Sequence, residues 1–137
     1  MPTERVLGDF LGRWEITRDI IPASGPRASF AGQAEWRAVP GGAAYCETGI
    51  LRLEGAAPMT AERRYLWGDD LSVRFEDGRA FHQVPAAGGE ATHFCDPDTY
   101  LVTYDFAGWP AFAVRHDVRG PRKDYVMISR YARGAAR

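Results

Sequence analysis

The stretch FLGRWEITRDII, residues 10–21, contains the change of pattern that decides the fold. Its apolar side chains at Trp14, Ile16 and Ile20 alternate with polar ones. A period of two residues is typical of a β-strand with one face buried and the other in solvent. We therefore predict that the first strand begins within this stretch.

The residues that precede this strand favour a short helical turn. Thr3 can cap the turn at its start, and Gly12 can end it. The apolar residues between them share one side of the turn: Val6, Leu7, Phe10 and Leu11. We therefore assign residues 1–12 to a helical turn.

Nine further runs with the character of short strands follow the first. They are SFAGQAEWRAV (29–39), AYCETGILRLE (44–54), AERRYLW (61–67), LSVRFED (71–77), RAFHQVP (79–85), EATHFC (90–95), TYLVTYDF (99–106), FAVRHDVR (112–119) and DYVMISRYAR (124–133). The breaks between them carry glycine, proline or aspartate, which favour turns for known backbone reasons. Nearly all of the breaks have the length of a hairpin loop.

So many short antiparallel strands would leave two exposed sheet edges unless the sheet closes on itself. Up-and-down closure into a barrel removes the edges, whereas a Greek-key sandwich needs some long connections. We therefore predict one all-β domain, an up-and-down antiparallel β-barrel of about 8–10 strands. The helical turn occupies residues 1–12, the barrel residues 13–133 and a short tail residues 134–137.

The charge balance bears on the class of partner. The chain has 17 basic and 18 acidic residues, scattered rather than grouped, and a net charge of −1. A nucleic-acid or acidic-membrane partner would require a basic stripe, so we expect neither. No apolar stretch is long enough for a signal peptide or a membrane span, so we expect no membrane insertion. Two cysteines without an export signal favour reduced thiols in the cytoplasm.

The motif Gly12-Arg13-Trp14, at the head of the first strand, resembles the Gly-x-Trp signature of the lipocalin and fatty-acid-binding-protein group, the calycins. In that group the tryptophan closes one end of the barrel, and an arginine of the last strand packs across it. The resemblance therefore implies structural roles for Gly12, Trp14 and Arg130.

Two features depart from the fatty-acid-binding proteins. Only PASGPR separates the first two strands, so the helical lid of that group is missing, and the Arg-x-Tyr carboxylate clamp of the last strand is not reproduced. The segments YCETGIL, RRYLW, DGRAFH, CDPDTY and GPRKDY also resemble an uncharacterised bacterial lipocalin-like family of unknown function. That resemblance supports the fold and implies no activity.

The segment GRAFHQVPAAGGEATHFCDPDTY, residues 78–100, carries two of the three histidines and one of the two cysteines. If residues 86–89 form the loop of a hairpin, His82 stands opposite His93, and Cys95 lies on the same face. A slip of one residue would separate the two histidines.

The same register predicts the neighbours of this hairpin. Phe81 and Phe94 would point to the opposite face. Beyond the turn at residues 96–99, Cys95 would face Tyr100, and His93 would face Val102, with Tyr104 continuing that face. One polar face would then run across three strands.

Several chemical interpretations of this face remain open. Zinc could be held by His82, His93 and Cys95, but the usual spacing of zinc ligands is absent, so we assign no metal or other cofactor. A Cys–His nucleophilic pair would need a helix N-terminus or a basic neighbour to activate the thiol. The remaining interpretations are a set of polar groups satisfied within the barrel and a ligand pocket.

Charged residues on apolar strand faces fit both of these remaining interpretations. Arg18 shares a face with Trp14, and Arg63 shares a face with Tyr65. Because charged residues are rarely buried without a partner, each arginine implies a nearby anion, either Glu47 or a ligand. The candidate ligand-binding residues are Arg18, Tyr65, His82, His93, Cys95, Tyr100, Tyr104 and His116.

We therefore expect a lipocalin-like protein that binds a small hydrophobic or amphipathic molecule inside the barrel. One alternative is a small acid/base enzyme of lyase or isomerase type on the same barrel, which would use histidine and tyrosine and is suggested by fold analogy alone. Another is a regulatory or interaction module that forms a homodimer through exposed aromatic side chains.

Overall fold

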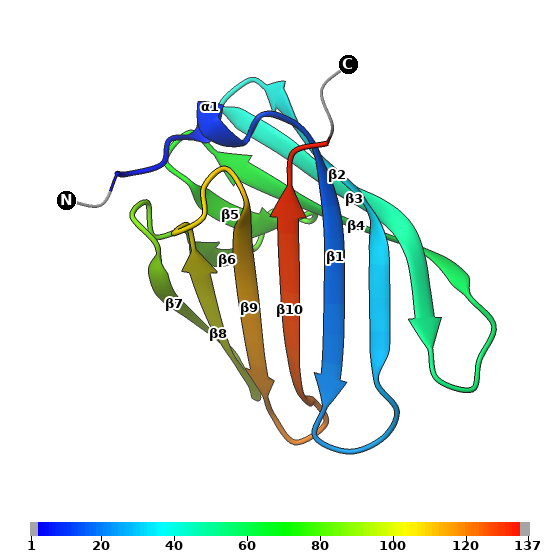
Figure 1. Ribbon diagram of the computed structural model, residues 1–137. Helices are drawn as coiled ribbons and strands as arrows, with labels where there is room; N and C mark the ends of the chain where they lie inside the picture. The colour runs from blue at the N-terminus through cyan, green and yellow to red at the C-terminus, as the bar shows by residue number, and fades with distance from the viewer. Residues whose placement is uncertain (1–2, 135–137) are drawn as a thin grey trace.

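The alternating runs fold into ten antiparallel strands of one continuous sheet (Figure 1). The computed structural model describes residues 3–134, so three residues of the expected tail, 135–137, lie outside the described part. The elements are α1 (Leu7–Phe10), β1 (Gly12–Pro22), β2 (Ala28–Val39), β3 (Gly42–Leu53), β4 (Met59–Gly68), β5 (Ser72–Phe75), β6 (Ala80–Gln83), β7 (Gly89–Cys95), β8 (Asp98–Asp105), β9 (Phe112–Arg119) and β10 (Asp124–Ala132). All ten predicted strands are found.

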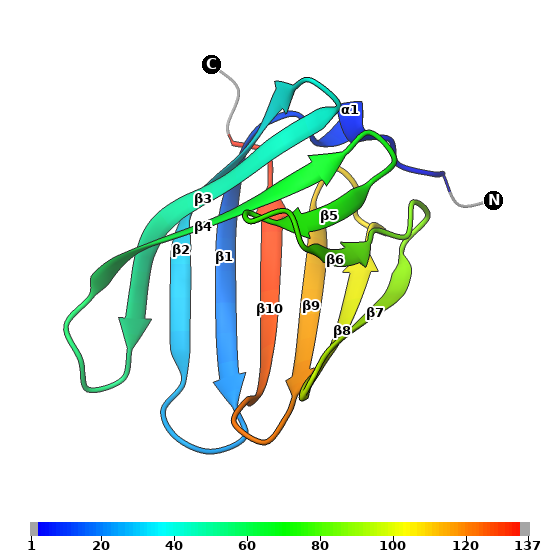
Figure 2. The same ribbon diagram turned by 180° about the vertical axis from the view of Figure 1, so that it is seen from behind.

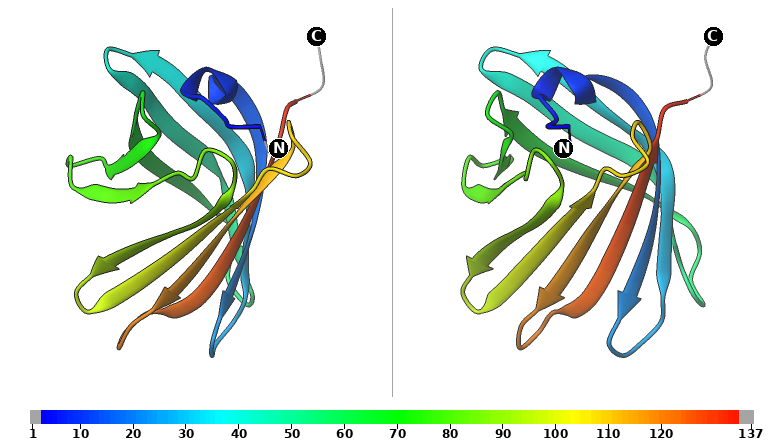
Figure 3. Two further views of the ribbon diagram at one scale, coloured as in Figure 1. Left: turned by 90° about the vertical axis from the view of Figure 1, so that its left-hand side faces the viewer. Right: turned by 60° about the vertical axis from the view of Figure 1, so that its left-hand side comes forward.

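The sheet curls until its two edges approach each other. The strand order is β6-β5-β4-β3-β2-β1-β10-β9-β8-β7, so the first and last strands of the chain pair in the middle of the sheet. Figures 1 and 2 show β1, β10, β9 and β8 in one wall, with β3 to β6 crossing on the other side. Figure 3 shows the curled sheet from the side of β6 and β7. The predicted all-β barrel with a short N-terminal turn is confirmed.

The two edge strands meet through side chains. Within residues 3–134, no backbone ladder joins β6 to β7. Instead the rings of Phe81 and His93 approach with their centroids 5.4 Å apart. The barrel is therefore nearly closed rather than fully hydrogen-bonded.

The helical turn is shorter than predicted. It spans Leu7–Phe10, and Val6 rather than Thr3 is its N-cap residue. No side chain caps the turn from the N-cap position; instead the Asp9 carboxylate accepts a hydrogen bond from the Val6 backbone N–H at 2.9 Å. In residues 3–134 no helix is long and apolar enough to cross a bilayer.

The helical turn α1 lies over one end of the barrel (Figure 1), and aromatic side chains pack against it there. Phe10 is fully buried, with its ring 5.2 Å from that of Trp67 and 5.6 Å from that of Trp36. Trp14 is 1 % exposed, and its indole N–H donates to the Phe10 carbonyl at 2.8 Å. The turn and the first strand are thereby fixed to the same apolar cluster.

Arg133, rather than Arg130, packs across Trp14. The Arg133 guanidinium carbon lies 3.8 Å from the centre of the Trp14 ring, and its nitrogens donate to the carbonyls of Asp9 and Arg13. Arg130 points outward and pairs with Asp19 at 3.1 Å. The reason is strand parity: Tyr131 is buried, so Arg130 must face solvent, whereas Arg133 follows the end of β10 and can fold over the barrel end.

We expect Arg133→Ala to lower the free energy of unfolding by about 1–2 kcal/mol, because it removes a cation–π contact and two hydrogen bonds to carbonyls. Urea denaturation measures this change. The matched variant Arg130→Ala removes only an exposed ion pair and should change stability by less than about 0.5 kcal/mol. Equal changes in the free energy of unfolding for the two variants would show that the contacts of Arg133 do not stabilise this end of the barrel.

Candidate functional site

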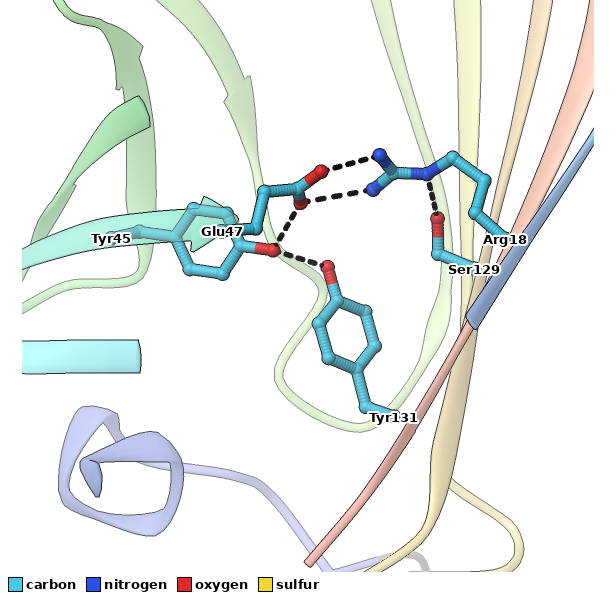
Figure 4. Close-up of polar contacts among 5 residues, drawn as sticks. All are labelled: Arg18, Tyr45, Glu47, Ser129 and Tyr131. Carbon is cyan, nitrogen blue, oxygen red and sulfur yellow. Dashed lines mark hydrogen bonds and ion pairs between the residues drawn. The ribbon is translucent and has the colours of Figure 1, made fainter. Parts of the chain in front are cut away.

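An ion pair lies in the interior of the barrel, between β1 and β3. Arg18 is 6 % exposed and Glu47 is 2 % exposed. Both guanidinium ends contact the carboxylate: Nη1 donates to Oε2, and Nη2 donates to Oε1 at 3.0 Å (Figure 4). Arg18 Nε donates to the Ser129 hydroxyl at 2.6 Å. Of the two explanations that the sequence left open for Arg18, Glu47 is therefore its partner.

Arg18 reaches Glu47 across an intervening strand. The two residues lie on strands that are separated by β2, and the diagonal between them crosses β2 at Gly32. A Cβ atom at Gly32 would lie 2.0 Å from the Thr48 carbonyl oxygen, so the close approach of the β2 and β3 backbones at this point requires glycine.

Two tyrosines extend the ion pair into a network. The Tyr45 hydroxyl donates to Glu47 Oε1 at 2.5 Å, and it lies 2.7 Å from the Tyr131 hydroxyl (Figure 4). Burial raises the pKa of both tyrosines, and the nearby carboxylate raises it further. Burial alone would lower the pKa of Arg18, but the hydrogen bond and the charge of Glu47 raise it above its usual value. Together with Ser129, the network thus holds one cation, one anion and three neutral hydroxyls.

A β-bulge in β6 places Phe81 and His82 on the same side of the sheet. His82 pairs with Val73 and Ala80 with Arg74, which leaves Phe81 unpaired between them. Phe81 is 4 % exposed, and His82 Nε2 lies 2.8 Å from the Tyr104 hydroxyl inside the barrel. The prediction that Phe81 faces away from His82 is therefore wrong, because a bulge interrupts the alternation.

The predicted register of the histidine hairpin is also wrong. His82 does not stand opposite His93, since β6 and β7 share no ladder in the described residues. His93 pairs with Tyr100, and Cys95 pairs with Asp98, because the turn consists of only the two residues between Cys95 and Asp98. Cys95 is exposed at the end of its strand. From residue 3 to residue 134, no three His, Cys, Asp or Glu side chains are grouped as metal ligands.

Three histidines nevertheless gather around one phenylalanine. The ring of Phe81 lies 4.3 Å from His82, 5.4 Å from His93 and 6.3 Å from His116, measured between centroids. Within the described residues, one nitrogen of each histidine is buried without a hydrogen-bond partner: His82 Nδ1, His93 Nε2 and His116 Nδ1. These atoms are available to a bound molecule.

The electrostatic surroundings keep two of these histidines neutral. Burial lowers the pKa of His82 to about 4, with a smaller contribution from His93. Burial also lowers the pKa of His116 to about 3, and the charges of Arg18 and Arg63 act in the same direction. At neutral pH each ring therefore offers one N–H donor and one acceptor nitrogen.

A cavity of about 30 Å³ lies between the ion-pair network and the histidines. It has room for about two water molecules. Of the predicted site residues, it is lined by Arg18, Tyr65, His82, Tyr104 and His116. Tyr100 and His93 lie beside it against Phe81, whereas Cys95 is not part of its lining.

Five polar residues of this interior were not among the predicted site residues: Tyr45, Glu47, Arg63, Ser129 and Tyr131. The spacing of four of them along the strands could have indicated that they share the inner face. Tyr45 and Glu47 are two residues apart on β3 and share its inner face, as do Ser129 and Tyr131 on β10. Alternation alone, however, does not tell which of the two faces of a strand lies inside.

We expect Glu47→Gln to lower the free energy of unfolding by about 3–5 kcal/mol, because it leaves the buried Arg18 charge without a counter-ion. The control Glu62→Gln removes the carboxylate of an exposed pair with Arg64 and should cost less than about 1 kcal/mol. Chemical denaturation compares the two. A small effect at Glu47 would mean that Arg18 is not held by this carboxylate.

The depressed histidine pKa values predict loss of stability in mild acid. The unfolded chain takes up protons below about pH 6.5, whereas folded His82 and His116 stay neutral down to about pH 4 and 3. As the pH falls below 6.5, each histidine therefore lowers the free energy of unfolding by up to about 1.4 kcal/mol per pH unit. His116→Gln should flatten the measured slope between pH 7.5 and 5.5, and the outward-facing neighbour Asp117→Asn should leave it unchanged.

The fold and the sequence were compared with known proteins. The structure is similar to that of the S-type phycobiliprotein lyase CPES from Guillardia theta, with a TM-score of 0.61 and 9 % sequence identity over 96 % of this chain and 92 % of that chain. At this identity the likeness shows the fold alone. No curated protein matches the sequence. The model of a protein family described as "Family of unknown function (DUF6314)" matches residues 10–133, which include every strand of the barrel, and the chain therefore belongs to this family.

Proposed function

We propose that this protein binds a small, partly apolar molecule inside its barrel. The observation that carries the proposal is the group of buried histidine nitrogens without partners beside an interior cavity. Leaving such an atom unsatisfied costs about 1–3 kcal/mol. A molecule that bonds to these nitrogens recovers this free energy, and binding sites typically place a few such groups among apolar walls.

The surroundings of the cavity supply the apolar part of the site. Phe81 stacks on Phe75 at 4.6 Å and on Tyr65 at 5.8 Å. Phe75 and Tyr65 are only partly buried, so they present accessible aromatic surface next to the cavity. Since the cavity holds only about two waters, we propose that the polar group of the ligand enters it and that the apolar part lies against these rings.

The comparisons support a barrel of this kind. The structural neighbour is itself named a lyase, so the likeness is compatible with either binding or catalysis on such a barrel. The tryptophan-plugged end, with an arginine over Trp14, supports a place among the calycins. We propose on this basis that the protein is lipocalin-like.

The structure favours binding over acid/base catalysis. The natural acid/base pair is His82 with Tyr104, whose reactive atoms are 2.8 Å apart. Burial lowers the pKa of His82 to about 4 and raises that of Tyr104 well above its usual value. A weak base beside a weak acid is poorly matched to proton transfer near pH 7.

The binding proposal predicts that 1-decanol, a small amphipathic probe, raises the melting temperature of the protein in differential scanning fluorimetry. His116→Phe should weaken this shift, because the new ring removes an unpartnered nitrogen and fills part of the cavity. The control Arg115→Gln changes the neighbouring outward-facing residue and should leave the shift intact. If decanol and other apolar probes leave the wild-type melting temperature unchanged at concentrations up to their solubility limits, the protein does not bind such molecules.

A further inference from the structure

The interior of the barrel contains one positive charge more than its side chains can balance. The ionised residues that line the cavity are Arg18, Arg63 and Glu47. Oε2 of Glu47 accepts from Arg18, while Oε1 accepts from both Arg18 and Tyr45. Glu47 is therefore paired with Arg18 and not with Arg63, and the lining carries a net charge of about +1 while its histidines are neutral.

Arg63 is the unbalanced cation. It lies on β4 directly opposite Glu47 in the strand register, and it is partly buried on the inner side with Tyr65. Its guanidinium makes no hydrogen bond or ion pair within residues 3–134, even though its sequence neighbour Arg64 pairs with Glu62 on the outer face. Because Arg63 is only partly buried and its guanidinium is not held by another side chain, it is available to an anion that enters the cavity.

We propose that the ligand carries one carboxylate and that Arg63 is its principal partner, an inference that rests on the proposed function. Guanidinium and carboxylate match in shape, because two parallel N–H groups can meet two oxygens. The cavity of about 30 Å³ accommodates about two oxygen-sized groups, which fits a carboxylate better than a phosphate with its additional oxygens.

Neutral histidines beside Arg63 complete the site. When the Tyr104 hydroxyl donates to His82 Nε2, the proton of that ring lies on Nδ1, the buried atom without a partner. His116 Nδ1 is likewise without a partner, and the charge of Arg63 is close enough to lower the pKa of that histidine. The anion would thus meet one full charge from β4 and N–H donors from β6 and β9.

The test compares three ten-carbon probes that differ in their polar group: decanoate, decyl phosphate and 1-decanol. Isothermal titration calorimetry at pH 7.5 should show that wild-type protein binds decanoate more tightly than the other two. Arg63→Gln should weaken decanoate binding about ten- to a hundredfold, the effect of one charge-assisted hydrogen bond, and should change decanol binding little. Arg64→Gln, on the outer face, should change neither.

The stability of the unliganded variant gives an independent readout. Because Arg63→Gln removes an unpaired charge near Arg18, the free protein should keep or increase its melting temperature, so weaker binding cannot be blamed on unfolding. Equal affinities for decanoate and decanol, or an Arg63→Gln variant that binds decanoate normally, would overturn the carboxylate inference and leave the binding proposal standing. Tighter binding of decyl phosphate would also overturn it. Failure of all three probes to bind would overturn both.

Discussion

The interior of this barrel is organised around one carboxylate. Glu47 accepts hydrogen bonds from Arg18 and Tyr45, and through them it is linked to Ser129 and Tyr131. Strands β1, β3 and β10, from both ends of the chain, are thereby tied together at one point. Because removing one partner from a buried ion pair leaves an uncompensated charge, the arrangement allows little substitution at either position.

The same carboxylate determines what the rest of the interior can do. Since Glu47 pairs with Arg18, Arg63 lines the cavity without a carboxylate partner. The histidines around Phe81 add polar atoms without adding charge, because burial keeps His82 and His116 neutral. The paired network around Glu47 and the histidines with unpartnered nitrogens therefore lie next to each other inside the barrel. The side chains of the first group bond to one another, whereas those of the second group have nitrogens that are not bonded to the protein.

The fold could be predicted from the sequence because alternation and turn residues are local signals. The ten strands and the place of Arg18 on an apolar face follow from the period of two and the turn residues, whereas the plug with Trp14 was implied by the resemblance of Gly12-Arg13-Trp14 to the calycin signature. The site was harder to predict because it depends on features that interrupt that period. The bulge at Phe81 reverses the expected facing of one residue, and the turn before Asp98 shifts the pairing of His93 by two positions. Arg133 lies beyond the last strand, where parity no longer applies.

Competition between charged residues could not be read from the sequence either. Arg18 and Arg63 both occupy inner faces, and Glu47 is available to either. In the structure Arg18, two strands away, holds both carboxylate oxygens, whereas Arg63 on the neighbouring strand holds neither. Pairing across an intervening strand cannot be foreseen from the positions of the residues in the sequence.

The gap in the hydrogen-bond pattern between β6 and β7 has a mechanical consequence. Every other pair of adjacent strands is joined by a ladder of backbone hydrogen bonds, and separating the two strands of such a pair breaks these bonds. In the described residues, β6 and β7 are held by ring contacts such as that between Phe81 and His93, which can slide or tilt without leaving backbone groups unsatisfied. The barrel wall is therefore weakest beside its unsatisfied histidines. A molecule that entered between β6 and β7 would separate aromatic rings and would break no backbone hydrogen bonds between strands.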